Sequence, residues 1–410
     1  MDLRQDCDFI VKKAVRAVRP EAAVQRALQG ETFDSGRLVL VAIGKAAWSM
    51  GSAAYDALGS KIDSGIVITK YGHVKGPLGP LVLREAGHPV PDANTFAATE
   101  EALKLTEGLT GNDTVLFLIS GGGSALFESP LIASVELMAL NRQLLSSGAS
   151  IVEINTIRKR LSAVKGGRFA EHCAPAKVYS IILSDIIGDP PDMIASGPAY
   201  PDSSTCEEAL ALAAKYGLSL SDKARALLER ETPKTLGNIR TLVTGSVRGL
   251  CRAAADAARI LGYEPQILTD SLNCEAREAG SFLAAIARSH QSPTRPLAFI
   301  AGGETVVHVK GTGRGGRSQE LALSAAAGIR GLTHTAVFSF GSDGTDGPTD
   351  AAGGFVTGES AGLLAAAGAD ISLYLDNNDA YSALAKCGGL IMTGPTGTNV
   401  NDAAVLLIRP

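Results

Sequence analysis

Short apolar runs rich in Val and Ile recur along the whole chain, and most end in Gly, Ser, Thr or Asp before a segment with helical spacing. Ten runs stand out, at residues 38–44, 65–70, 114–123, 177–185, 240–246, 265–271, 296–304, 335–344, 390–397 and 403–408. Apolar strands that alternate with helices predict mostly parallel sheets covered on both faces. The pattern therefore predicts an α/β fold, opened by an amphipathic helix in residues 6–29 that breaks at Pro20 and continues as a second short helix.

The number of strands bears on the domain organisation, because ten strands are many for one sheet. The polar stretch 217–239 lies between apolar blocks and is the best linker candidate. We therefore predict an N-terminal domain at residues 1–239 and a C-terminal α/β domain at residues 240–410, which a βαβ unit at residues 241–271 opens. Ligands in such sheets bind beyond the carboxyl ends of the strands, so the polar loops there form the candidate site.

Composition narrows the class of protein. The chain has 410 residues, 45% hydrophobic content and a formal net charge of −4, which is typical of a globular protein and offers no basic surface for nucleic acid. The six cysteines form no C-x-x-C pair, which fits a reducing compartment and argues against a zinc site. The chain starts without a signal-peptide pattern and contains no apolar run of membrane-spanning length. We expect a cytoplasmic protein that contacts neither nucleic acid nor membranes.

A glycine-rich stretch at residues 302–320 carries Arg314 and Arg317. We expect a strand at residues 306–310 and a helix at residues 317–327, whose free N–H groups would favour an anion. A turn with two solvated arginines is equally compatible with this loop. The triplet Gly311, Gly313 and Gly316 is weak evidence for a dinucleotide, because residues 321–342 contain no acid to hold a ribose.

Two further loops follow predicted strands. Gly44-Lys45 precedes a helix, where a lysine is suited to a phosphate or a carboxylate, although a solvent-exposed lysine is the simpler alternative. Residues 120–124, Ser-Gly-Gly-Gly-Ser, offer backbone N–H groups that favour an anion nest for nucleotide phosphates. A hydrolase nucleophile elbow is the competing interpretation, but G-x-S-x-G is not matched and we see no histidine at a strand end to serve as base.

Charged residues cluster in three more places. Five cations lie in residues 158–168, where Lys165 and Arg168 flank two glycines; a solvated basic helix face is the alternative. Asp185, Asp189 and Asp192 follow a predicted buried strand, where acids on rigid turns suit a metal or a base for a hydroxyl. Glu304 ends another strand. The glycine-rich loop 341–354 presents three aspartates suited to Mg²⁺, namely Asp343, Asp346 and Asp350.

Seven stretches together closely resemble the class II glycerate kinases, whose C-terminal half carries the MOFRL domain. They are VAIGKAAWSM, LISGGGSALF, NTIRKRLSAVKGGR, SDIIGDPPDMIASGP, GGETVVHVKGTGRGGRSQELAL, SDGTDGPTDAAGG and TGPTGTNVND, and they cover nearly the whole chain. The resemblance implies a two-domain protein with a Rossmann-like N-terminal domain, an active site in the interdomain cleft, and ATP-dependent phosphorylation of D-glycerate to 2-phosphoglycerate with Mg²⁺ or another divalent cation. The family's active-site lysine corresponds to Lys45 and its cleft arginine to Arg317.

These elements suggest a mechanism as a hypothesis, with Lys45, Arg317 and Asp189 as the catalytic residues. An arginine binds the glycerate carboxylate, and Asp189 accepts the hydroxyl proton. Mg²⁺ bridges the phosphates and the carboxylates of Glu304, Asp343, Asp346 and Asp350. The predicted ATP-binding residues are Ser120, Gly121, Gly122, Gly123, Ser124, Lys165, Arg168, Gly313 and Arg314.

Two other classes remain open. A nicotinamide-dependent hydroxypyruvate reductase would use the glycine triplet at residues 311–316 and a similar three-carbon acid, although the missing ribose acid weighs against it. A non-catalytic sensor would bind a sugar acid without ATP turnover. A homo-oligomer is possible in each case.

Overall fold

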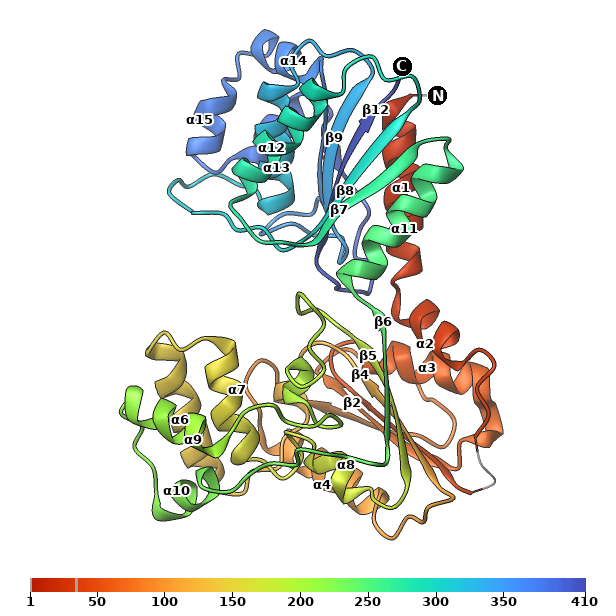
Figure 1. Ribbon diagram of the computed structural model, residues 1–410, viewed down its shortest axis with the longest axis vertical. Helices are drawn as coiled ribbons and strands as arrows, with labels where there is room; N and C mark the ends of the chain where they lie inside the picture. Colours follow the sequence, from red (N-terminus) through yellow and green to blue (C-terminus); the bar gives the residue numbers. More distant parts are fainter. Residues whose placement is uncertain (1, 34–35) are drawn as a thin grey trace. The chain divides into compact units, whose positions relative to one another are not determined.

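The computed structural model describes residues 2–33 and 36–410, which form two compact units (Figure 1). One unit is Ala23–Thr244, and the other combines the chain up to Ala22 with Gly245–Pro410. The division differs from the predicted 1–239 and 240–410 in two ways. The later boundary falls at Thr244, and the opening helix belongs with the C-terminal half of the chain.

The Ala23–Thr244 unit is built on a six-stranded sheet in the order β3-β2-β1-β4-β5-β6. Adjacent strands from β3 to β5 run parallel. The strands are β1 Leu38–Ile43, β2 Ser64–Lys70, β3 Val82–Ala86, β4 Thr114–Ile119, β5 Lys177–Leu183 and β6 Ile239–Gly245. This is the strand order of the Rossmann fold, which confirms the Rossmann-like prediction for the N-terminal half.

Helices cover both faces of this sheet. Every residue of β1 is buried, and its alternate side chains face opposite sides. Val39, Val41 and Ile43 share a core with Ala98 and Ala102 of α4. The helix α3 packs on β1 and β2 as well. The helices of this part are α2 Pro20–Leu28, α3 Ala47–Leu58, α4 Ala93–Leu105, α5 Gly123–Leu126 and α8 Arg168–His172, with one-turn helices η1 Gly59–Lys61 and η2 Ile194–Ser196.

Four helices of the same unit form a separate cluster with its own apolar core. They are α6 Ser134–Ser146, α7 Ile151–Arg160, α9 Cys206–Lys215 and α10 Asp222–Leu228. Leu144, Ile157, Ala209 and Leu228 are buried together in this core. The predicted linker at residues 217–239 is therefore not a free connection, because its first half contributes α10 to this cluster.

The second unit contains another six-stranded sheet, in the order β11-β10-β9-β12-β8-β7. Its strands are β7 Glu264–Leu272, β8 Leu297–Gly303, β9 Thr335–Gly341, β10 Gly353–Thr357, β11 Leu390–Ile391 and β12 Asp402–Ile408. The pair β7–β8 is parallel, whereas the pairs made by β8–β12, β9–β12, β9–β10 and β10–β11 are antiparallel. The expectation of a mostly parallel sheet is thus wrong for this unit, although the α/β class holds.

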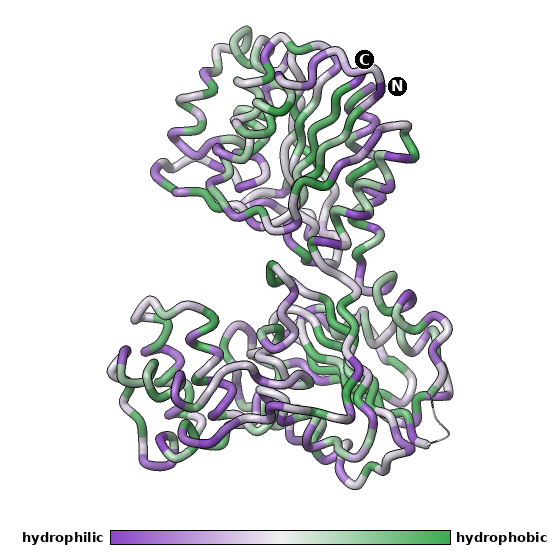
Figure 2. The backbone as a smooth tube through the Cα atoms, viewed as in Figure 1, coloured by the Kyte–Doolittle hydropathy of each residue, from purple (hydrophilic) through white to green (hydrophobic). Residues whose placement is uncertain are grey.

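Helices lie on both sides of the second sheet (Figure 1). The helices α12 Ala276–Ser289 and α13 Arg317–Gly328 share one core with the sheet, and α11 Val247–Ile260 packs on β7 and β8 with α1 Leu3–Ala17 beside it. The remaining helices are α14 Ser360–Ala366, α15 Ile371–Asp376 and α16 Ala380–Lys386. Hydrophobic residues run along the strands of both sheets, while hydrophobic and hydrophilic residues alternate along the helices (Figure 2). No helix among the described residues combines the length and the apolar character needed to cross a bilayer.

All ten predicted apolar runs contain a strand, but two strands escaped prediction and one predicted strand does not form. The strand β3 (VLREA) is a half-exposed edge strand, and β10 (GGFVT) begins with two glycines. The predicted strand at residues 306–310 is reduced to an isolated bridge between Val306 and Glu275.

A buried polar cluster links Asp6 of α1 to Tyr263, just before β7, and to Arg409, just after β12. Asp6 is 1% exposed. It accepts a hydrogen bond from the Tyr263 hydroxyl at 2.5 Å and pairs with the Arg409 guanidinium. Burial, and then the hydrogen bond to Asp6, raise the pKa of Tyr263 above its ordinary value, so the hydroxyl keeps its proton as a donor.

Replacing Asp6 by Ala should lower the free energy of unfolding by about 3 kcal/mol, because it removes the buried acceptor of Tyr263 and the anion beside Arg409. Urea unfolding would measure the loss. The control is Asp8→Ala on the same helix, since the Asp8 side chain is 57% exposed and its pair with Arg4 should contribute below about 0.5 kcal/mol. Equal losses in the two variants would contradict this role of Asp6.

Candidate active site

The loops that follow β1 and β4 are bound to each other. The Ser120 hydroxyl donates to the carbonyl of Ile43 at 3.2 Å and accepts the Ala46 N–H at 3.0 Å. The Lys45 N–H donates to the carbonyl of Gly121 at 2.9 Å. In a Rossmann strand order the first and fourth strands flank the switch point, where ligands bind. The structure therefore brings two of the predicted elements, Lys45 and the loop 120–124, together at that point.

The side chain of Lys45 lies beside Gly122 and His88. A Cβ atom built on Gly122 would lie 3.2 Å from Lys45 Cγ and 2.9 Å from His88 Nε2, so only glycine leaves room there. Burial lowers the pKa of His88, and the nearby charge of Lys45 lowers it further. His88 comes two residues after β3, so the statement that no histidine sits at a strand end is wrong. It was missed because β3 was not recognised.

Lys165 is completely buried beneath this loop. Its ammonium donates to the carbonyls of Ser124 at 2.9 Å and Phe127 at 2.7 Å, and it pairs with Glu128 at 3.0 Å. Burial lowers its pKa, and the charge of Glu128 opposes that shift. With these three partners, Lys165 supports the loop 120–128 from inside the protein. These contacts do not favour the predicted direct contact between Lys165 and a nucleotide.

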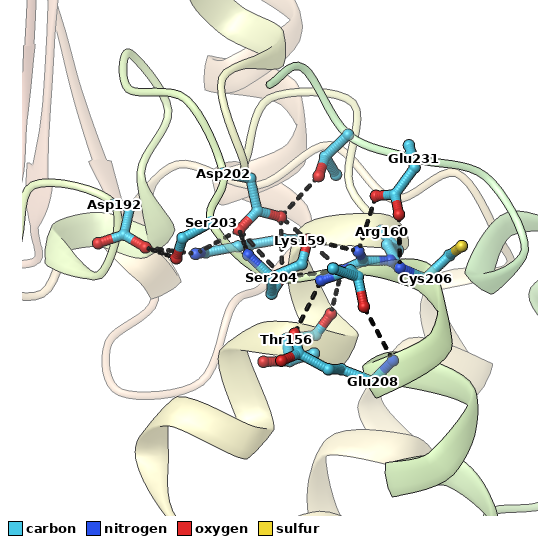
Figure 3. A network of polar contacts seen from close by, with 12 residues as sticks. Thr156, Lys159, Arg160, Asp192, Asp202, Ser203, Ser204, Cys206, Glu208 and Glu231 are labelled. Carbon is cyan, nitrogen blue, oxygen red and sulfur yellow. Dashed lines mark hydrogen bonds and ion pairs between the residues drawn. The ribbon is translucent and has the colours of Figure 1, made fainter. Parts of the chain in front are cut away.

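The basic segment 158–168 is no solvated face. Lys159 and Arg160 are 1% and 0% exposed. Lys159 pairs with Asp202 at 2.9 Å, while Arg160 lies 3.7 Å from Asp202 and 3.2 Å from Glu231 (Figure 3). The predicted nucleotide contact Arg168 donates from Nη1 to the carbonyls of Lys159, Arg160 and Ser162, where α7 ends. Lys159, Arg160 and Arg168 therefore hold segments of the chain together rather than a ligand.

The loop after β5 places Asp185 against the same switch-point loop. A Cβ atom on Gly121 would lie 2.2 Å from Asp185 Oδ2, so the carboxylate lies against that glycine. Asp189, the predicted base, has a positive φ of 53°. Its Oδ1 atom is buried without a hydrogen-bond partner among the described residues. Asp189 is thus available as an acceptor, and its catalytic role remains a prediction.

In the second unit, Arg317 lies at the start of α13 between two carboxylates. It donates to Asp402 from Nε at 2.5 Å and from Nη2 at 3.3 Å, and to Glu304 from Nη1 at 2.5 Å. Asn401 donates to Glu304 as well, at 3.3 Å. Burial raises the pKa of Asp402 to about 6 despite the charge of Arg317. Burial alone would lower the pKa of Arg317, but Asp402 and Glu304 outweigh it and raise that pKa.

The N-terminus of α13 is already occupied by the carboxyl group of Asp346. Its oxygens accept the N–H groups of Ser318 at 3.2 Å and Gln319 at 2.8 Å. Burial raises the pKa of Asp346 to about 7, and the two backbone donors oppose the shift. The predicted helix is confirmed, but the expectation that its free N–H groups await a ligand is wrong at these two positions.

The glycine loop 311–316 is packed against residues 377–379. The Asn378 amide oxygen accepts the N–H groups of Lys310 and Gly311, and Asp379 accepts that of Arg314. Asn377 accepts the N–H groups of Thr312 and Gly313. The Arg314 guanidinium stacks over the Tyr381 ring at 4.8 Å. The backbone donors of residues 310–314 are therefore occupied, and Gly313 and Arg314 are poorly placed to bind phosphate through backbone N–H groups.

The predicted magnesium ligands are each engaged elsewhere. Glu304 pairs with Arg317, Asp343 accepts the Thr345 N–H, and Asp350 accepts the Tyr381 hydroxyl. Asp346 holds the helix as described. Within residues 2–33 and 36–410, no group of three or more His, Cys, Asp or Glu side chains is placed to hold a metal ion. That one or two of these carboxylates hold Mg²⁺ together with phosphate oxygens remains a prediction.

Two pockets adjoin these elements, one in each unit. A pocket of about 630 Å³ has Arg317 in its lining, together with residues that include Gly313, Gly316, Asp343, Asp346 and Asp402. A small pocket of about 120 Å³ lies beside the loop 120–124, and its lining includes His88, Gly122 and Ser124. Ligand pockets commonly measure about 300–1,000 Å³, so the first is large enough for a nucleotide and the second only for a small molecule.

The strand order, with Lys45 and a glycine loop at the switch point, defines an α/β protein of the Rossmann type with its candidate ligand site at that point. Residues 6–229 match the family described as a domain of unknown function, DUF4147, and residues 297–402 match the MOFRL family. The chain belongs to the class II glycerate kinase family, a family of phosphotransferases with a C-terminal MOFRL domain.

Relatives agree with this assignment. The chain is 54% identical to D-glycerate 2-kinase of Thermotoga maritima over 405 residues, 97% of each chain. It is 39% identical to glycerate 2-kinase of Pyrococcus horikoshii over 100% of this chain and 98% of that one. A crystal structure of glycerate kinase from Thermotoga maritima superposes with a TM-score of 0.95, 53% identity and 99% coverage of both chains. A relative from Agrobacterium vitis, 42% identical over 99% of this chain and 94% of its own, is named a putative hydroxypyruvate reductase.

Replacing Asp202 by Asn should lower the free energy of unfolding by about 3–5 kcal/mol, because Lys159 and Arg160 would lose their buried anion. Hydrogen bonds from Thr232 and Lys159 outweigh the effect of burial and hold the pKa of Asp202 below 3.8. The stabilisation is therefore present above pH 3.8 and should disappear as the pH falls through the folded-state pKa. Urea unfolding at several pH values measures both effects. A loss no larger than that of the exposed control Asp222→Asn would contradict them.

Replacing Lys45 by Met should raise the pKa of His88, because the charge of Lys45 contributes to its depression. The pKa should stay below 6.5, since burial, the largest cause, and the charges of Lys70 and His73 remain. Titration of the histidine ring protons by NMR, assigned with His88→Gln, measures the shift. The exposed control Lys61→Met should leave it unchanged; an unshifted His88 in Lys45→Met would disprove their proximity.

Proposed function

We propose that this protein is a D-glycerate 2-kinase, which transfers the terminal phosphoryl group of ATP to the 2-hydroxyl group of D-glycerate. The observation that carries the proposal is the 54% identity to D-glycerate 2-kinase over 97% of each chain, together with Lys45 at the switch point of a Rossmann sheet. Phosphoryl transfer depends mainly on positioning and on cations at the transferred group. The two loops at the switch point supply such an environment.

Lys45 and Arg317 have the roles expected of charged groups that stabilise the transferred phosphoryl. Lys45 extends from the loop that Ser120 fixes to β1, so its backbone is held in place. Arg317 is oriented by Asp402 and Glu304 and lies among the residues that line the pocket of the second unit. A cation that is already positioned costs no reorganisation when charge develops. Asp189 is proposed as the proton acceptor.

The nucleotide is proposed to be ATP carried as its Mg²⁺ complex. Among the described residues no three of these side chains group as metal ligands, so one or two of the carboxylates of Glu304, Asp343, Asp346 and Asp350 would hold the ion together with phosphate oxygens. The pocket of about 630 Å³ beside Arg317 is large enough for the nucleotide. The six cysteines are all free, which supports a cytoplasmic location.

A hydroxypyruvate reductase is less well supported, although one relative carries that name. A dinucleotide fingerprint needs free backbone donors in a loop between a strand and a helix. Here residues 377–379 occupy the backbone donors of residues 310–314, and residues 306–310 form no strand. ADP release from ATP and D-glycerate, with NADH oxidation by hydroxypyruvate measured alongside, separates the two functions. NADH oxidation without ADP release would overturn the kinase.

Replacing Lys45 or Arg317 by Ala should reduce turnover by roughly 10² or more, a loss typical of removing one group that stabilises transition-state charge. Steady-state ADP release measures the effect, and circular dichroism checks the fold. The exposed controls Lys61→Ala and Arg330→Ala should keep the turnover of the unmodified protein. Near-normal turnover in Lys45→Ala or Arg317→Ala would remove that residue from the mechanism.

A further inference from the structure

The small pocket beside the switch-point loop has the dimensions of a small metabolite. Its volume of about 120 Å³ corresponds to roughly four water molecules at ~30 Å³ each. The loops after β3 and β4 and the helices α6 and α7 contribute its lining, which includes His88, Ser124, Glu128, Asn141 and Arg158. The pocket therefore admits a molecule of a few non-hydrogen atoms and excludes a nucleotide.

Arg158 presents a cation to this pocket in a fixed orientation. Its Nε donates to the amide oxygen of Asn141 at 2.6 Å. Its Nη1 and Nη2 atoms have no hydrogen bond within the part of the chain that the structure describes. Burial lowers the pKa of Arg158 and the charge of Glu128 opposes the shift, but a guanidinium remains protonated. The two terminal nitrogens form a planar pair of donors, the geometry that binds a carboxylate in bidentate fashion.

Glu128 adds an unused acceptor to the same pocket. The residue is 3% exposed, and its Oε2 atom pairs with Lys165 at 3.0 Å. Its Oε1 atom is buried and has no hydrogen-bond partner among the described residues. A buried oxygen without a partner is destabilising, so such an atom in a native protein calls for an explanation such as a functional role. A ligand hydroxyl group would supply the missing donor.

We propose that this pocket is the acceptor subsite, in which Arg158 binds the carboxylate of a small hydroxy acid and Glu128 Oε1 accepts a hydrogen bond from one of its hydroxyl groups. The inference deepens the proposed function, on which it rests for the identity of the acid as D-glycerate. The pocket shares Gly122 with the surroundings of Lys45, whose side chain lies 3.2 Å from a Cβ built on that glycine. A substrate held here lies next to the proposed phosphoryl-stabilising cation.

The direct test is Arg158→Gln in the full-length protein, compared with Arg142→Gln, an exposed arginine on the neighbouring helix α6. Loss of a bidentate charged contact should raise the KM for D-glycerate about 10–100-fold and leave the KM for ATP within about twofold. The preference for D-glycerate over uncharged glyceramide should fall by a similar factor. Arg142→Gln should match the unmodified protein in all three quantities.

Arg158→Lys is a second variant for the case that Arg158→Gln does not fold, because it keeps the positive charge. It should recover part of the affinity for D-glycerate, because a lysine pairs with a carboxylate without the bidentate geometry. An unchanged KM for D-glycerate in both variants, or an equal rise for ATP, would overturn the subsite. Failure of the unmodified protein to phosphorylate D-glycerate would refute the proposed function instead. Calorimetric binding of D-glycerate, abolished in Arg158→Gln, would still support the pocket in that case.

Discussion

The contact between the loops after β1 and β4 is the interaction on which the candidate site depends. Ser120 uses its hydroxyl both as a donor to Ile43 and as an acceptor from Ala46, and it thereby fixes the backbone that carries Lys45. Gly44 permits this approach, because its φ is 111° and a Cβ atom there would lie 2.3 Å from Ser120 Oγ. The strand order explains why this contact matters, since β1 and β4 are neighbours that meet where a Rossmann sheet binds its ligands.

Buried charged side chains hold the loops of the candidate site in place. Lys165 ties Glu128 and the carbonyls of Ser124 and Phe127 together, while Lys159 and Arg160 surround Asp202. Removing a charge from water is costly, so such groups are tolerated only in pairs with good hydrogen bonds. In the second unit, the same principle orients Arg317 between Asp402 and Glu304. Both units thus present a few charged groups whose positions other charges determine.

Much of the fold could be predicted from apolar runs, because a strand buried on both faces leaves a continuous pattern. The edge strand β3 escaped because Arg84 and Glu85 break that pattern, and His88 was overlooked with it. The antiparallel pairs of the second sheet were also missed, since strand direction depends on connections that alternation alone does not specify. Lys45 and residues 120–124 were found because they follow clear strands.

The remaining site residues depend on contacts distant in sequence. The counter-ions of Lys159 and Arg160 include Asp202, which follows them by more than forty residues, so the sequence could not show that these cations are buried. Asp346 looked like a metal ligand, but it holds the N-terminus of α13. Glu128 carried no local signal, and Asp402, although it ends the stretch TGPTGTNVND, was not singled out as a site residue. Spacing therefore revealed which loops matter, whereas three-dimensional contacts revealed which side chains in them are free to act.

The identity of the reaction is tested most directly by ³¹P NMR of the product formed from ATP, Mg²⁺ and D-glycerate. Phosphate on the secondary hydroxyl couples to a single neighbouring proton, so the account predicts a new phosphomonoester signal split into a doublet. A triplet would place phosphate on the terminal hydroxyl and contradict a 2-kinase. The absence of any phosphomonoester signal would contradict the kinase itself.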